Sequence, residues 1–68
     1  MRLTVNGSEQ IAEDRVTVAT LVDRVAPARK ARGTAVAVNG EVIPKRQWAS
    51  TMLSEGDRIE VLHAIGGG

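Results

Sequence analysis

The residues most suited to chemistry in this sequence are the last three, Gly66, Gly67 and Gly68, which follow a stretch with the pattern of a β-strand. Because glycine has no Cβ atom, such a tail can enter a narrow cleft of another protein and present its terminal carboxylate there. The segment from Ile65 to Gly68 reaches roughly 13 Å when extended. We interpret it as a chemical handle whose reactive group is the carboxylate of Gly68. The alternative is a frayed end or a cloning remnant, both common at chain termini.

Catalytic motifs are absent from the rest of the sequence. It contains neither the glycine-rich motifs that bind dinucleotides or nucleoside triphosphates nor the His-Glu-x-x-His zinc motif. With one histidine and no cysteine, a Ser-His-Asp arrangement would have to use His63, which is better explained as an ordinary strand residue. We therefore expect no catalytic residue and no metal or cofactor bound by this chain, which is not expected to be an enzyme.

Size and charge narrow the class of protein further. A chain of 68 residues forms one small domain, and nine basic against eight acidic residues give a net charge of +1. This balance argues against a nucleic-acid partner. The basic cluster Arg29, Lys30 and Arg32 has no aromatic residue between its members for base stacking and is expected to be a solvated loop. The absence of cysteine, of a membrane-spanning run and of a signal peptide predicts a cytoplasmic protein without membrane contacts.

The first twelve residues are predicted to form a β-hairpin. Leu3 and Val5 alternate with polar residues, as in a half-buried strand. Asn6-Gly7 is the dipeptide that favours a tight type I′ turn. A second strand is expected over residues 8–12, with Ile11 facing the core.

A short amphipathic helix is predicted next. Thr17 is suited to the N-cap position, where its hydroxyl accepts a hydrogen bond from the first turn. Apolar residues then follow at helical spacing: Val18, Leu21, Val22 and Val25. Pro27 is expected to end the helix because proline cannot continue the hydrogen-bond ladder. With a single apolar face, this helix needs a sheet on which to pack.

Two more strands are predicted after the helix. In the segment 34–38, Val36 and Val38 are expected to face the core. Asn39-Gly40 repeats the turn dipeptide, and the short strand 41–43 stops at a proline, which places it near a sheet edge. Trp48 follows in a less regular segment. We expect its indole in the core because a domain this small cannot easily leave its largest apolar group in water.

The final strand is predicted over residues 58–65, after a turn at Glu55-Gly56-Asp57. If Ile59 and Val61 face the helix, the alternation of a strand places Leu62 on the solvent side. A single exposed leucine is ordinary. Its position just before the glycines nevertheless makes Leu62 a candidate contact for a partner protein.

The order of these elements predicts the fold class. A hairpin, a helix and three further strands favour an α+β arrangement in which one main helix packs across one face of a mixed sheet. The domain is expected to occupy residues 1–64, followed by a flexible tail at 65–68.

Several motifs together resemble the ThiS family, the sulfur carriers of thiamin biosynthesis. The resemblance spans essentially the whole chain, and it is specific because the motifs occur in combination. They are the block Val38 to Trp48 (VNGEVIPKRQW), then Leu53, Gly56-Asp57, Ile59-Glu60 and the ending Ile65-Gly-Gly-Gly68. Gly66 stands where members of the family often have alanine. The resemblance implies the ubiquitin-like β-grasp fold.

The resemblance also implies a mechanism. An adenylating enzyme of the ThiF type would use ATP and magnesium to convert the Gly68 carboxylate into an acyl-adenylate. Sulfur derived from cysteine, delivered through a cysteine desulfurase, would then displace AMP and give a thiocarboxylate. Thiazole synthase of the ThiG type would receive this sulfur. In this scheme Gly68 is the covalent site, and Gly67 and Gly66 keep the tail slim.

Other functions are compatible with the same residues. The small subunit of molybdopterin synthase is also a β-grasp thiocarboxylate carrier, and related carriers serve cysteine synthesis or tRNA thiolation. A ubiquitin-like modifier would be activated in the same way but would form isopeptide bonds through Gly68. A plain interaction module would have an incidental glycine tail.

Overall fold

The computed structural model describes residues 1–26 and 33–63. In these two segments the chain forms five strands, one α-helix and one 3₁₀ helix. They are β1 (Arg2–Val5), β2 (Ser8–Ile11), α1 (Val18–Val25), β3 (Thr34–Val38), β4 (Glu41–Ile43), η2 (Lys45–Ser50) and β5 (Arg58–His63). Four predictions fall outside the described residues: the helix stop at Pro27, the basic cluster at residues 29–32, the continuation of the last strand beyond residue 63, and the glycine tail.

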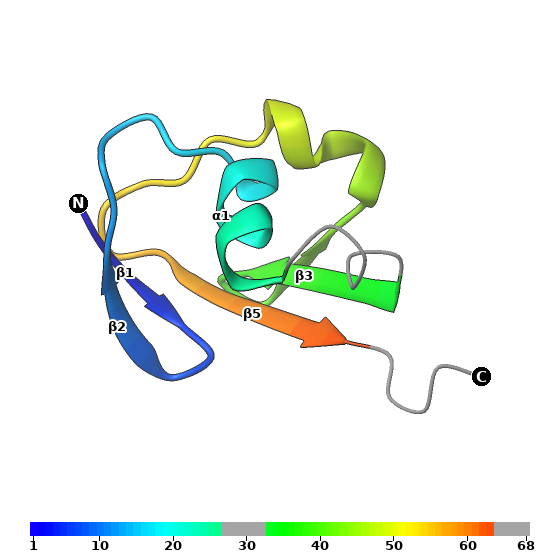
Figure 1. Cartoon of the computed structure of the whole chain (residues 1–68), viewed down its shortest axis with the longest axis horizontal. Helices are drawn as coiled ribbons and strands as arrows, with labels where there is room; N and C mark the ends of the chain where they lie inside the picture. Colours follow the sequence, from blue (N-terminus) through cyan, green and yellow to red (C-terminus); the bar gives the residue numbers. More distant parts are fainter. Residues whose placement is uncertain (27–32, 64–68) are drawn as a thin grey trace.

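The five strands form one mixed sheet in the order β2-β1-β5-β3-β4. β1 and β5 run parallel, whereas β1–β2, β3–β4 and β3–β5 are antiparallel. Figure 1 shows α1 and η2 on the same side of the sheet, with β5 crossing its middle. The predicted arrangement of one main helix across a mixed sheet is therefore confirmed. As predicted, β4 is an edge strand.

Both Asn-Gly pairs form the expected tight turns. Asn6 and Gly7 have φ angles of 50° and 83°, and Asn39 and Gly40 have 51° and 86°. Positive φ at both central residues defines the type I′ turn, whose twist matches that of the strands it joins. The two turns bring β2 against β1 and β4 against β3.

The helix begins where the sequence predicts. Thr17 is its N-cap, and its Oγ1 accepts a hydrogen bond from the backbone N–H of Thr20 at 3.2 Å. The helix ends at Val25, followed by an extended Ala26, the conformation favoured by a residue that precedes proline. Of the predicted apolar face, Val18, Leu21 and Val22 are buried, whereas Val25 in the last turn is 37% exposed.

Ile11 was predicted to face the core, and this prediction is wrong. Its side chain is 74% exposed. The two-residue turn fixes a register in which Ile11 pairs with Arg2, and paired residues lie on the same face of a sheet. Arg2 alternates with the buried Leu3, so Arg2 and Ile11 both lie on the face opposite α1.

Trp48 lies in the core, as predicted. Its side chain is 6% exposed, and its indole Nε1 donates a hydrogen bond to the carbonyl of Ile43 at 2.9 Å. The irregular segment that carries it is the 3₁₀ helix η2, which packs against α1. The other buried apolar side chains come from both layers and their connections: Leu3, Val5, Ala12, Val16, Val18, Leu21, Val22, Ala26, Val36, Leu53, Ile59 and Val61.

Candidate functional site

Strand β5 connects the core to the C-terminal residues. It lies between β1 and β3 in the middle of the sheet, and the sequence continues from it to Gly68. Ile59 and Val61 are buried towards α1, with 0% and 3% of their surface exposed. Leu62 points the other way and is 66% exposed, which confirms its predicted strand phase.

Leu62 belongs to an apolar area on the face of the sheet that α1 does not cover. Leu62 pairs with Ala35 across β5 and β3, and Ala37 pairs with Val42 across β3 and β4. Paired residues share a face, so all four side chains lie on the same side. We call these four residues, Ala35, Ala37, Val42 and Leu62, the open-face patch. Val42 is 69% exposed. The two alanines of β3 lie between Val42 on β4 and Leu62 on β5, and their short side chains project little from the sheet.

The rest of this face is more polar. Arg58 and Glu60 precede Leu62 on the same side of β5 and are both exposed. On β1 and β2, Arg2 Nε lies 3.5 Å from Glu9 Oε2 in an exposed ion pair. The apolar part of the face therefore lies over β3, β4 and the end of β5, which is the end that leads to the glycines.

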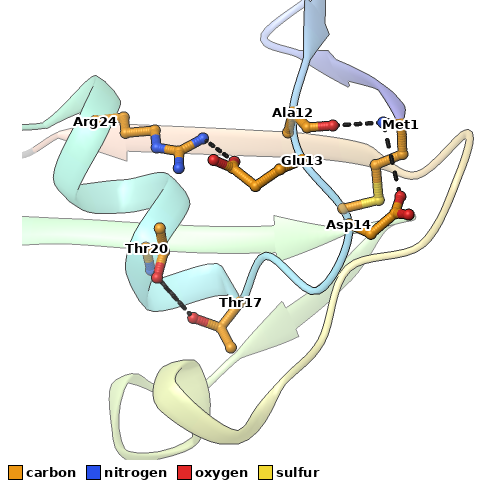
Figure 2. Close-up of polar contacts among 7 residues, drawn as sticks. All are labelled: Met1, Ala12, Glu13, Asp14, Thr17, Thr20 and Arg24. Atoms are coloured by element: carbon orange, nitrogen blue, oxygen red, sulfur yellow. Dashed lines mark hydrogen bonds and ion pairs between the residues drawn. The ribbon is translucent and has the colours of Figure 1, made fainter.

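Polar contacts connect the segment after β2 to the last turn of α1 and to the N-terminus. The Arg24 Nη1 and Glu13 Oε1 atoms are 2.7 Å apart, which ties the helix to the segment after β2 (Figure 2). The hydrogen bond from Arg24, assisted by its charge, lowers the pKa of Glu13, and Glu13 in turn raises the pKa of Arg24. The N-terminal amine of Met1 donates a hydrogen bond to the carbonyl of Ala12 and lies 4.0 Å from Asp14 Oδ1.

Two asparagine side chains bind the backbone of β5, a feature that the sequence reasoning missed. Asn6 Oδ1 accepts a hydrogen bond from the N–H of Val61 at 2.8 Å, and Asn6 Nδ2 donates to the carbonyl of Val61 at 3.1 Å. Asn39 Oδ1 accepts from the N–H of Arg58 at 2.9 Å. The Asn-Gly pairs signalled the turns. For the hydrogen bonds to β5, the only signal in the sequence was the residue type, because an asparagine side chain can both donate and accept hydrogen bonds.

In residues 1–26 and 33–63, no group of three or more His, Asp and Glu side chains is arranged to hold a metal ion. No helix of the same segments is long and apolar enough to cross a membrane. The proposed covalent site at Gly68, with Gly67 and Gly66, lies outside the described residues.

Comparison with curated proteins finds two relatives. A thiazole synthase of Paramagnetospirillum magneticum is 34% identical over 68 residues, which is 100% of this chain and 20% of that protein. The sulfur carrier protein ThiS of Escherichia coli is 39% identical over 36 residues, or 53% of this chain and 54% of that protein. The matches thus span only part of the length of either relative.

Comparison with solved structures establishes the fold. The crystal structure of the thiamine biosynthesis protein ThiS from Geobacter metallireducens has a TM-score of 0.83 and 33% sequence identity, with 100% of both chains covered. A solution structure of a thiamine biosynthesis protein from the same organism has a TM-score of 0.80 at 33% identity, and it covers 100% of this chain and 88% of that one. The predicted ubiquitin-like β-grasp fold is confirmed.

The family comparison agrees with the whole-chain structural match. The family model described as the ThiS family matches residues 1–68, so the match includes the glycines as well as the sheet and the helix. Together with the shared β-grasp fold and the motifs from Val38 to Trp48, this match shows that the chain belongs to the ThiS family.

Proposed function

We infer that this chain is a sulfur carrier of thiamin biosynthesis, and that Gly68 carries the sulfur as a thiocarboxylate. The observation that carries this proposal is the family match over residues 1–68, which includes the terminal glycines. The E. coli relative, named sulfur carrier protein ThiS, supports the same function. In this proposal the chain is a carrier and co-substrate of cytoplasmic enzymes, with a β-grasp domain at 1–64 and a tail at 65–68.

The chemistry begins with the poor reactivity of a carboxylate towards nucleophiles. Its negative charge is delocalised over two oxygens, and neither oxygen is a good leaving group. An adenylating enzyme of the ThiF type solves this by joining the Gly68 carboxylate to the AMP portion of ATP, with magnesium on the phosphates and pyrophosphate as the product. The terminal sulfur of a persulfide, formed from cysteine by a desulfurase, then attacks the carbonyl carbon, and AMP leaves. A second thiol breaks the S–S bond of the resulting acyl disulfide, which releases the thiocarboxylate and forms a disulfide between the two thiols.

In this proposal the chain contributes a tail that is slim enough to enter the active site of the adenylating enzyme. Gly67 and Gly66 lack side chains, so the segment before the reactive carbonyl fits a cleft that excludes bulkier residues. ATP and magnesium are co-substrates of the partner and need no binding site on the carrier. The carrier instead needs a surface by which the partner recognises it.

The open-face patch is our candidate for that surface. Leu62 is exposed on the strand that leads to Gly68, and Val42 extends the apolar area across β3 to β4. A partner that covers these residues also holds the end of β5 close to its active site. Burial of such side chains at a protein interface is favourable. We propose that Leu62 contacts the adenylating enzyme.

Thiazole synthase is the proposed acceptor of the sulfur. The Paramagnetospirillum protein named thiazole synthase contains a segment that matches the whole of this chain, within a protein about five times longer. A ThiS-like segment and a thiazole synthase in one polypeptide support the idea that the two act together.

The test is the intact mass of the chain after incubation with the adenylating enzyme, Mg-ATP and sodium sulfide. Exchange of one oxygen for sulfur adds about 16 Da to the chain. A reaction without ATP is the control and should leave the mass unchanged. Covalent joining to another protein would instead indicate a ubiquitin-like modifier. Transfer of the sulfur to thiazole synthase then separates a thiamin carrier from carriers for molybdopterin, cysteine or tRNA thiolation.

A further inference from the structure

The two neighbours of β5 support it over different lengths. β3 pairs with five of the six residues of β5, from Val38 opposite Ile59 to Thr34 opposite His63. β1 pairs with β5 only at Thr4 and Val5, after which β1 ends and the chain turns away. The half of β5 that leads to the glycines therefore has a strand neighbour on only one flank in the described part of the chain.

Asn6 fills the position of the missing strand residue. Its backbone N–H donates to the carbonyl of Ile59 at 2.9 Å, which continues the ladder by one step. Its side-chain amide then binds both backbone groups of Val61, at 2.8 Å and 3.1 Å. The amide thus supplies the one acceptor and the one donor that a neighbouring strand would otherwise supply to Val61. We call this pair of hydrogen bonds the Asn6 clamp.

The Asn6 clamp binds β5 near the end of the strand, where it can fix the direction in which the chain leaves the sheet. Val61 is the last buried residue of β5 among those described, and it immediately precedes the exposed Leu62. The N–H and the carbonyl of Val61 both point to Asn6 and away from β3. Without the clamp, neither group would have a partner in a neighbouring strand, and the backbone hydrogen bonds of β5 to β3 would come only from the residues on either side of Val61. The end of β5 would then sample a wider range of directions, and the glycines that follow would reach an active site in fewer productive orientations.

We propose that Asn6 is a positioning residue for the activation of Gly68. The proposal rests on the sulfur-carrier function inferred above. The Asn6 clamp acts through β5 and fixes the direction in which the strand delivers the tail to the adenylating enzyme. The open-face patch keeps three of its four residues on β3 and β4, which the clamp does not touch. Loss of the clamp should therefore impair the chemical step more than docking.

Asn39 provides a matched control in the same chain. It occupies the first position of the other type I′ turn, with φ of 51° against 50° at Asn6. Its Oδ1 also accepts a hydrogen bond from β5, but at Arg58, the start of the strand. Its Nδ2 donates to Asp57 Oδ1 at 3.0 Å. The two asparagines share a turn type and a kind of contact, and they differ in their distance along β5 from the tail.

The test compares Asn6→Gly with Asn39→Gly. Glycine keeps the positive φ that each turn needs and removes only the side-chain amide. Steady-state release of pyrophosphate by the adenylating enzyme gives kcat and KM for each carrier, and urea unfolding gives stability. We expect Asn6→Gly to lower kcat about tenfold or more, with KM changed much less, because a small misplacement of a reacting group has effects of this order. Asn39→Gly should keep the wild-type kcat.

Amide hydrogen exchange tests the clamp without any partner. In Asn6→Gly the Val61 N–H should exchange faster than in the wild type, while amides paired with β3 keep their protection. If the Val61 N–H exchanged at the same rate in Asn6→Gly and in the wild type, the proposal would be overturned. Equal kcat values for Asn6→Gly and Asn39→Gly would also overturn it and leave Asn6 a structural residue. A wild-type chain that the enzyme does not adenylate would instead overturn the proposed function, and the role of Asn6 with it.

Discussion

Leu62 of β5 lies directly opposite Ala35 of β3, on the face of the sheet that α1 leaves uncovered. The pair places a large apolar side chain next to a small one at the end of the strand that leads to Gly68. Val61, the preceding residue, is 3% exposed and faces the core. Adjacent residues of β5 thus serve opposite purposes, one in stability and one in the proposed recognition.

A charge at Leu62 should separate recognition from stability. Leu62→Arg leaves the core intact because the side chain is already 66% exposed, so its unfolding free energy should stay near that of the wild type. The proposed contact with the adenylating enzyme would be lost, and KM for the carrier should rise about tenfold or more, as for a central interface residue. Steady-state adenylation and urea unfolding measure the two effects.

Ile11→Arg is the control for this substitution. Ile11 is 74% exposed on the same face of the sheet, but it lies on the edge strand β2, away from the open-face patch. Its KM should be unchanged. An equal rise in KM for both variants would mean that charge rather than contact is responsible, and an unchanged KM for Leu62→Arg would exclude Leu62 from the interface.

Deletion of Gly68 should abolish sulfur loading without loss of stability. The truncated chain ends in Gly67, whose carboxylate no longer reaches the adenylating site, while the buried residues of the core stay in place. Intact mass after incubation with ATP, sulfide and the enzyme should show no gain, and thermal unfolding should match that of the wild type. Full loading of the truncated chain would contradict the carrier mechanism.

Gly67→Val tests whether the tail must be slim. Valine adds a β-branched side chain that widens the tail and restricts its backbone. We expect it to load far more slowly than the wild type in the same mass assay. Loading at the wild-type rate would show that the partner cleft tolerates a side chain at this position.

The local rules of sequence explain which parts of the fold were predictable. Thr17 caps the helix and Asn6-Gly7 forms a tight turn because each depends on neighbours a few residues away. The face of Leu62 was predicted correctly because side chains alternate along a strand, so that assigning Ile59 and Val61 to the core assigns Leu62 to the opposite face. Ile11 was misplaced because its face depends on the register that the turn imposes, and that register places an isoleucine opposite Arg2.

Contacts between distant segments were beyond the reach of such rules. Asn6 and Val61 are separated by 55 residues, and their hydrogen bonds exist because β1 pairs in parallel with β5 and ends early. No periodicity in the sequence predicts this parallel pairing or the point at which it ends. Residue type and family resemblance suggested Gly68 as the site, which lies outside the described residues and stays a prediction. Val42 and the alanines of β3 could be assigned to the open-face patch only once the strand order was known.

The pair of Glu13 and Arg24 should make stability depend on pH. The hydrogen bond from Arg24 lowers the pKa of Glu13 below its ordinary value of 4.5 in the folded protein. The stabilising contribution is therefore complete above the unfolded-state pKa, and it is lost as the pH falls through the lower folded-state pKa. The effect should be small, because both side chains are exposed and an exposed pair is screened by water and salt.

Glu13→Gln removes the titrating group and tests this prediction. Urea unfolding at a series of pH values from about 6 to about 3 should show a smaller loss of stability in Glu13→Gln than in the wild type. The difference between the two proteins should shrink in 1 M salt, where the Debye length is only about 3 Å. Asp23→Asn, which removes an exposed carboxylate of α1, is the control and should follow the wild-type profile more closely. A wild-type protein that gains stability relative to Glu13→Gln as the pH falls would contradict the lowered pKa.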